Sequence, residues 1–103
     1  MVIDGASTDG TLACVAAHGA HLARVVSEPD RGIYDAMNKG IRLATGDVIG
    51  ILNADDVYAD SEVLSRVAKI MEDTQVDAVY ADVEFFRSEK PEAIVRRYSS
   101  RHF

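Results

Sequence analysis

The chain contains 103 residues, which is the size of one ordinary domain. Its 11 basic and 17 acidic residues give a net charge of −6, which excludes a basic nucleic-acid surface as its main feature. Hydrophobic residues make up 48% of the chain, which excludes disorder. No apolar run approaches the ~20 residues that a membrane-spanning helix needs.

The sequence predicts a cytoplasmic location. The N-terminus shows no basic stretch followed by an apolar core, so no signal peptide is visible. The single cysteine, Cys14, cannot form an internal disulfide or a thiolate metal cluster. Because Cys14 lies in an apolar helical stretch, we expect it to be a buried thiol.

The first half of the chain alternates between strand and helix patterns. The spacing of Leu12, Val15 and Ala16 is typical of a helix, and Gly46 is placed to end a second one. In order, the predicted elements are a strand at Met1–Asp4, a helix at Thr11–His18, a strand at Leu22–Ser27 and a helix at about Ile33–Ala44.

The next segment, Asp47–Leu52, contains the run Val48–Leu52, which is nearly all apolar and therefore typical of a strand covered on both faces of a parallel sheet. The alternation of strands and helices predicts an α/β fold with a mostly parallel sheet. The remaining predicted elements are a helix at about Ser61–Glu72, a strand at Ala78–Arg87 and a weaker strand at Ala93–Tyr98.

Two polar clusters follow predicted strands, at Asp4–Asp9 and at Asn53–Asp56. Ligands of such sheets bind outside the carboxyl ends of the strands. The adjacent carboxylates Asp55 and Asp56 repel each other, and a hard divalent cation would relieve that repulsion. The alternative is a plain loop in which Asp56 caps the next helix.

Two other segments could face a ligand. The glycines of Gly5–Thr11 would let a ligand approach the backbone near a helix N-terminus, although an ordinary turn has the same composition. Within Glu28–Gly40, the residues Asp35, Asn38 and Lys39 share about one helical turn. Arg31 and Lys39 are natural phosphate partners, but a solvated helix face is the alternative.

Together these segments resemble the family 2 glycosyltransferases. The matching strings are Val2–Thr11, Ser27–Ile41 and Ala44–Tyr58, with a looser match over about residues 76–86. The resemblance implies a truncated GT-A fold, which is a Rossmann-like, mostly parallel sheet flanked by helices. It also implies that residues 1–103 form a single partial domain that binds a nucleotide-sugar.

Members of this family transfer a sugar from a nucleotide-sugar, often a UDP-sugar, to an acceptor. The resemblance therefore implies a glycosyltransferase of polysaccharide or glycoconjugate synthesis, peripheral to the inner face of the membrane in its full-length form. The sequence identifies neither the sugar nor the acceptor. Two other hypotheses are a nucleotide- or metal-binding module without catalysis and a structural interaction module.

The resemblance also implies roles for single residues. Asp4 matches an aspartate that contacts the base, Asp55 one that faces the ribose, and Asp56 one that holds Mn²⁺ or Mg²⁺. Such an ion would stabilise the negative charge that grows on the diphosphate leaving group. The nucleotide-sugar-binding set implied in this way is Asp4, Ser7, Asp35, Lys39 and Asp55.

The chain departs from the family pattern in several places. Asn53 and Gly5 stand where many members have aspartate. The catalytic base is expected outside this chain, and so are a strand and a helix that precede Asp4 in the family. That strand would lie between Met1–Asp4 and Val48–Leu52. We therefore expect its neighbours either to close on each other or to pair with a second copy in a homo-oligomer.

Overall fold

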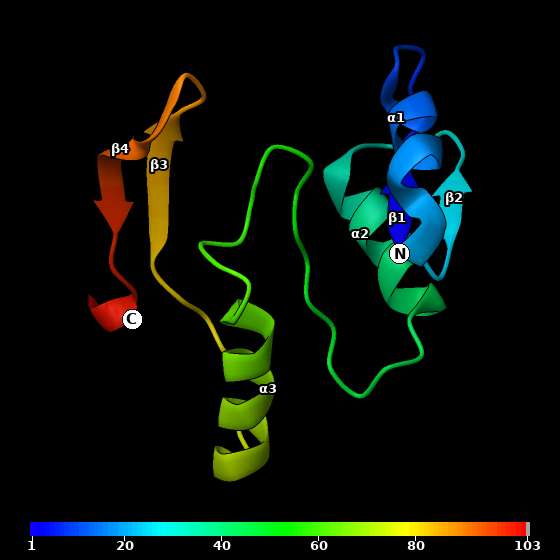
Figure 1. Ribbon diagram of the computed structural model, residues 1–103. Coiled ribbons are helices and arrows are strands. Elements are labelled where there is room, and N and C mark those ends of the chain that lie inside the picture. Colours follow the sequence, from blue (N-terminus) through cyan, green and yellow to red (C-terminus); the bar gives the residue numbers. More distant parts are fainter. Residues whose placement is uncertain (103) are drawn as a thin grey trace. The chain divides into compact units, whose positions relative to one another are not determined.

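The computed structural model describes residues 1–102, with the side chain of residue 102 excepted. Contacts within the chain gather in two compact units, Met1–Asp56 and a second unit that begins at Val57 (Figure 1). Compact contacts do not show that a unit folds alone, so the expected single domain over residues 1–103 stays a prediction.

The first unit alternates strand and helix as predicted. Its elements are β1 (Val2–Asp4), α1 (Thr11–His18), the short 3-10 helix η1 (Gly19–His21), β2 (Val25–Ser27) and α2 (Ile33–Leu43). Helix α1 has the predicted bounds. Helix α2 ends one residue early because the backbone of Ala44 turns to an extended conformation, with φ −68° and ψ 143°.

Strands β1 and β2 form a parallel pair, which bears out the α/β class. Their register places Val2 opposite Val25, Ile3 opposite Val26 and Asp4 opposite Ser27. The amide of Glu28 continues the pairing by donating to the carbonyl oxygen of Asp4 at 3.1 Å. Both strands therefore end at the same edge, and each ends on a polar residue.

Helix α2 packs against β1 at Gly40. A Cβ atom at Gly40 would lie only 3.4 Å from Cγ1 of Ile3, which is the tight end of ordinary contact. The apolar residues Ile33, Met37 and Ile41 recur at helical spacing along α2. These three side chains line a groove, and Met1 and Ile3 line it as well.

The segment Val48–Leu52 is not a strand, so the expectation from its apolar run is wrong. Within residues 1–102 it pairs with no strand, and its side chains stay about half exposed, with Ile51 at 54% and Leu52 at 48%. An extended segment becomes a strand only when a neighbour satisfies its backbone groups. The groove lies between this segment and β1, so the two do not close on each other.

The second unit contains a helix and a β-hairpin. Its elements are α3 (Val63–Thr74), β3 (Val83–Arg87), β4 (Lys90–Tyr98) and the short 3-10 helix η2 (Ser100–His102). Strands β3 and β4 are antiparallel, and Phe85 packs edge-on against Tyr98 at 5.6 Å between ring centroids. Strand β3 begins later than the alternation of residues predicts, because its pairing with β4 within residues 1–102 starts only at Val83, opposite Tyr98.

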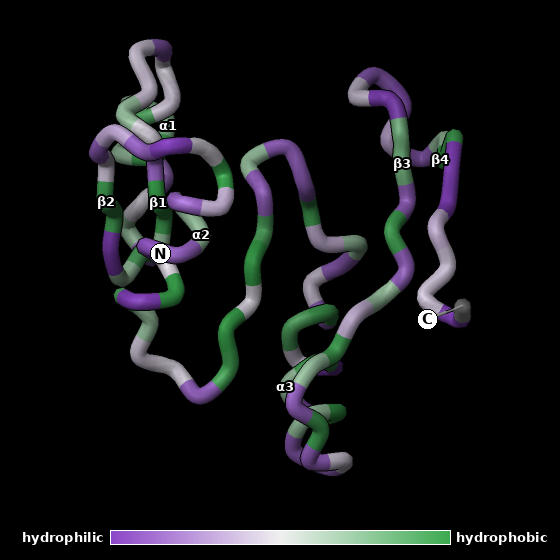
Figure 2. The backbone as a smooth tube through the Cα atoms, turned by 180° about the vertical axis from the view of Figure 1, so that it is seen from behind, coloured by the Kyte–Doolittle hydropathy of each residue, from purple (hydrophilic) through white to green (hydrophobic). Residues whose placement is uncertain are grey.

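Burial is low throughout the described chain. Asp4 is the only fully buried residue among those described, and none of their hydrophobic side chains is fully buried. Figure 2 shows a long hydrophobic stretch between α2 and α3. Cys14 is exposed, contrary to expectation, because the apolar side of α1 has little chain packed over it. No helix within residues 1–102 has the length and hydrophobicity to cross a membrane.

Candidate functional site

The carboxyl edge of the β1–β2 pair holds a buried carboxylate, Asp4, which is 6% exposed. Its Oδ1 accepts a hydrogen bond from Ser7 Oγ at 2.5 Å. Its Oδ2 accepts one from Ser27 Oγ at 2.6 Å and one from the backbone amide of Ser7 at 3.1 Å. These donors, that of Ser27 first, hold the pKa of Asp4 below its ordinary value and keep it ionised.

The loop after β1 folds back onto Asp4. Ala6 adopts a left-handed backbone conformation, with φ +64°, and this turn directs the amide and hydroxyl of Ser7 toward the carboxylate. Ser7 therefore lies beside Asp4, and a nucleotide pocket lined by both stays a prediction. Ser27 is a partner that the sequence analysis missed, although its position at the end of the neighbouring strand was a usable signal.

Asp9 lies just before helix α1, whose N-cap residue is Gly10, and it contacts the first residue of the helix. Its Oδ1 accepts hydrogen bonds from the backbone amide of Thr11 at 2.9 Å and from Thr11 Oγ1 at 2.5 Å. The hydroxyl of Thr11 is the main reason that the pKa of Asp9 is lowered. The first turn of α1 thus already faces a carboxylate, which makes this helix end a poor place for a phosphate.

The loop between β2 and α2 is tied down by two of the predicted site residues. Lys39 Nζ donates to the carbonyl oxygen of Pro29 at 2.7 Å and pairs with Glu28 at 3.1 Å. The side chain of Lys39 is only 14% exposed. One turn earlier in α2, Asp35 Oδ2 accepts a hydrogen bond from the amide of Arg31 at 3.1 Å, which lowers the pKa of Asp35. Both residues hold this loop in place.

Arg31, in the loop between β2 and α2, has a guanidinium group that is exposed to solvent. Its side chain is 91% exposed, and its Nε lies 3.8 Å from the carboxylate of Asp35. An ion pair at that distance and exposure is weak. The guanidinium of Arg31 is therefore free to turn toward an anion, whereas the ammonium of Lys39 is already engaged.

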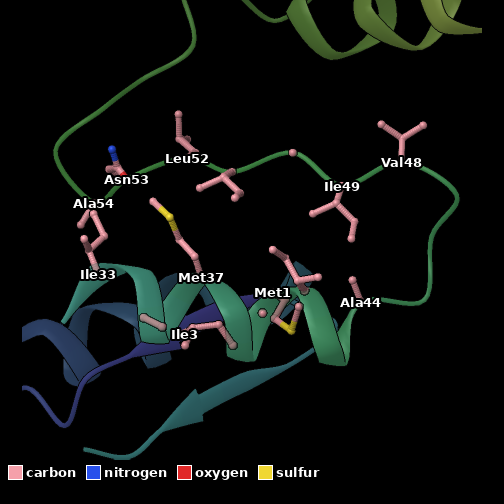
Figure 3. A pocket seen from close by; sticks show the side chains of 15 residues that line it. Met1, Ile3, Ile33, Met37, Ala44, Val48, Ile49, Leu52, Asn53 and Ala54 are labelled. Atoms are coloured by element: carbon pink, nitrogen blue, oxygen red, sulfur yellow. The ribbon is translucent and has the colours of Figure 1, made fainter. Parts of the chain in front are cut away.

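The segment 48–54 follows the direction of β1 across the groove. Figure 3 shows Ile49 opposite Met1, whereas Ala54 lies opposite Ile33, the first residue of α2. The groove has a volume of about 450 Å³ and apolar walls. The polar residues that follow Leu52 therefore emerge at the same end of the unit as the carboxyl end of β1.

A tight turn closes this segment at Asn53–Asp56. The amide of Asp56 donates to the carbonyl oxygen of Asn53 at 3.1 Å. The side chains also meet, because Asn53 Nδ2 donates to Asp56 Oδ2 at 3.2 Å. Asp55 and Asp56 are both exposed, and Asp56 keeps one carboxylate oxygen without a partner within residues 1–102.

The turn at Asn53–Asp56 offers only two carboxylates, those of Asp55 and Asp56, as ligands for a metal ion. Among the described residues, no three His, Cys, Asp or Glu side chains are grouped to hold a metal ion. Mg²⁺ and Mn²⁺ are often bound through one or two carboxylates together with the phosphates of a substrate, and Asp55 and Asp56 are carboxylates that could serve in this way.

The family model for glycosyl transferase family 2 matches residues 1–101 of the chain. No solved structure shows a significant match. A PGL/p-HBAD biosynthesis glycosyltransferase of Mycobacterium bovis is 39% identical over 87 residues, which is 81% of this chain and 34% of that protein. The chain therefore spans about a third of the length of this curated relative.

Two further proteins are similar to most of this chain. An uncharacterised glycosyltransferase of Mycobacterium tuberculosis is 37% identical over 71 residues, which is 69% of this chain and 27% of that protein. The chondroitin synthase of Escherichia coli is 33% identical over 81 residues, which is 77% of this chain and 12% of that protein. With the family model covering nearly every residue, this chain belongs to the glycosyl transferase family 2.

Proposed function

We propose that this chain is the nucleotide-sugar-binding part of a glycosyltransferase. The observation that carries the proposal is the common direction of β1 and segment 48–54. This direction brings the loop after Asp4 and the turn at Asn53–Asp56 to one end of the first unit. Ligands of parallel sheets bind at the carboxyl ends of strands, and a nucleotide needs both a polar wall and an anion site there.

In this proposal each polar element has its own task. Asp4 and Ser7 form the wall of the base and ribose pocket, and Asp55 faces the ribose. Lys39 and Asp35 fix the loop that carries Arg31, and the guanidinium of Arg31 faces the phosphates. Asp56, with its free carboxylate oxygen, is the main metal ligand.

The donor is a nucleotide-sugar, and we propose a UDP-sugar held together with Mn²⁺ or Mg²⁺. The bound ion supplies Lewis-acid stabilisation of the diphosphate leaving group. The names of the relatives point to glycoconjugate and polysaccharide products, and we propose the same broad class of product here. We assign no residue of this chain as the catalytic base, and we propose no particular acceptor substrate.

Calorimetric titration with UDP in the presence and absence of Mn²⁺ tests this proposal. Asp56→Asn should abolish the Mn²⁺-dependent binding while the far-UV circular dichroism spectrum is retained. The matched control is Asp47→Asn, which makes the same change at the other end of the same exposed segment and should bind as the unaltered chain does. Equal binding by the two variants would contradict the metal assignment.

A second measurement separates the enzyme from a binding module. The chain would be incubated with UDP-sugars and Mn²⁺, and donor hydrolysis and sugar transfer would be followed. UDP binding without turnover would favour the module without catalysis, because the chain then holds the donor but lacks the acceptor side. No UDP binding at all would leave the structural interaction module as the better hypothesis.

A further inference from the structure

One wall of the groove in the first unit is β1, whose backbone is paired on one side only. Within residues 1–102, β1 pairs with β2 and with no other strand. Figures 1 and 3 show the segment Val48–Leu52, called the apolar run below, on the side of β1 that faces away from β2. The edge of β1 toward the groove is therefore open, and an open edge is a template for pairing with another chain.

The apolar run is the opposite wall, and its backbone has no partner either. None of its backbone amide or carbonyl groups is bonded to the backbone of any residue that the structure describes. Its side chains stay about half exposed. An apolar patch of this kind marks an interaction surface, and an extended backbone with free donors and acceptors needs only a neighbouring strand.

The groove between these two walls selects for an uncharged occupant. None of the residues that line it has a charged side chain. A charged side chain brought into such surroundings would lose its hydration without gaining a partner. The chain as a whole has a net charge of −6, so most of its surface repels a second copy. The occupant must therefore be extended, apolar and free of charge over the length of the run.

This chain itself supplies such a segment. Outside the helices of residues 1–102, Val48–Ala54 is the longest stretch without a charged side chain, and it contains the apolar run. One wall of the groove thus has the composition that the groove of another copy requires. A surface that is complementary to itself forms a closed dimer with two-fold symmetry.

We propose that two copies of this chain form a dimer in which the apolar run of each copy enters the groove of the other. Within one copy the run follows the direction of β1. A two-fold axis perpendicular to the sheet reverses the partner's run, so the new strand pairs are antiparallel. The strand order becomes β2, β1, partner run, run, partner β1, partner β2. This single sheet pairs the open edge of each β1 and both edges of each run.

Ile51→Pro tests the backbone pairing separately from apolar burial. Proline removes the amide donor but keeps an uncharged, apolar side chain, and within one copy that amide has no backbone hydrogen bond to lose. Sedimentation velocity over a concentration series measures the dissociation constant of the dimer. We expect Ile51→Pro to raise this constant at least about tenfold, because each of the two runs loses a ladder bond. The matched control Ile51→Leu keeps both the amide and the apolar bulk, so its dimer should resemble that of the unaltered chain.

Disulfide cross-linking locates the interface without relying on the folding of the proline variant. Single cysteines would be placed in turn along the apolar run in a Cys14→Ser background and then oxidised. Opposite residues of an antiparallel pair have Cβ atoms about 4.5–5.5 Å apart, so the position nearest the two-fold axis should cross-link fastest. The unaltered chain is the control, because its exposed Cys14 lies on α1, outside the run, and should cross-link slowly.

Three results would overturn the proposal. The first is the mass of a single chain at every concentration, which would exclude the dimer. The second is a folded Ile51→Pro variant, judged by circular dichroism, that dimerises as tightly as Ile51→Leu, which would exclude strand pairing. The third is cross-linking that is equally fast at all positions of the run, or fastest through Cys14, which would place the contact between copies elsewhere.

Discussion

Gly32 is the residue whose replacement should affect the first unit through backbone strain alone. It lies immediately before α2 with φ +112° and ψ 177°, a region that is essentially closed to residues with a Cβ atom. No heavy atom lies within 4 Å of the point where a Cβ would sit, so no steric clash adds to the strain. Gly32→Ala should therefore cost about 1–3 kcal/mol of the free energy of unfolding.

The strain cannot relax without other losses. The carbonyl oxygen of Gly32 accepts from the amides of Asp35 at 2.9 Å and Ala36 at 3.2 Å, which start the helix. Its own amide donates to Asp30. A rotation that relieves the backbone at position 32 would break these bonds, so the chain either keeps the strain or loses the start of α2.

Urea unfolding followed by far-UV circular dichroism measures this cost. In small proteins the free energy of unfolding falls by about 1–3 kcal/mol for each 1 M of urea. A variant that loses about 2 kcal/mol of this free energy therefore unfolds at a midpoint roughly 1 M lower. Gly10→Ala is the matched control, because Gly10 precedes α1 with φ −76° and also has nothing within 4 Å of a Cβ. We expect Gly10→Ala to cost less than about 1 kcal/mol. Equal midpoints for the two variants would refute the strain argument.

Two further predictions concern Asp4 and the groove. Hydrogen bonds from Ser27 and Ser7 lower the pKa of Asp4 from the ordinary 3.8, so their stabilisation is present above about pH 4 and is lost as the pH falls through the lower pKa of the folded state. Asp4→Asn should flatten this acid dependence of the urea midpoint, and an unchanged dependence would show that Asp4 does not cause it. The half-exposed apolar side chain of Ile51 should also promote association of copies. Multi-angle light scattering should therefore give a higher mass for the unaltered chain than for Ile51→Lys, and two equal masses would count against an interface at the groove.

The sequence by itself determined the elements that local spacing controls. The helix at Thr11–His18 has the predicted bounds, and the helix that begins at Ile33 differs by a single residue at its end. A helix satisfies its own backbone hydrogen bonds, so its apolar period and its end signals are enough to locate it. The motifs around Asp4 and Asp55 also placed the chain in its family, which the family model confirms.

Only the tertiary structure decided the features that depend on a distant partner. The run Val48–Leu52 has the composition of a buried strand, yet it pairs with no strand of the described residues, because a strand needs hydrogen bonds from another segment. The same holds for the carboxylates: Asp4 is engaged by Ser27, 23 positions away, and Asp30 lies over Gly5. The sequence showed which residues carry carboxylates, but long-range packing decided that Asp4 is buried and that Asp30 stays partly exposed.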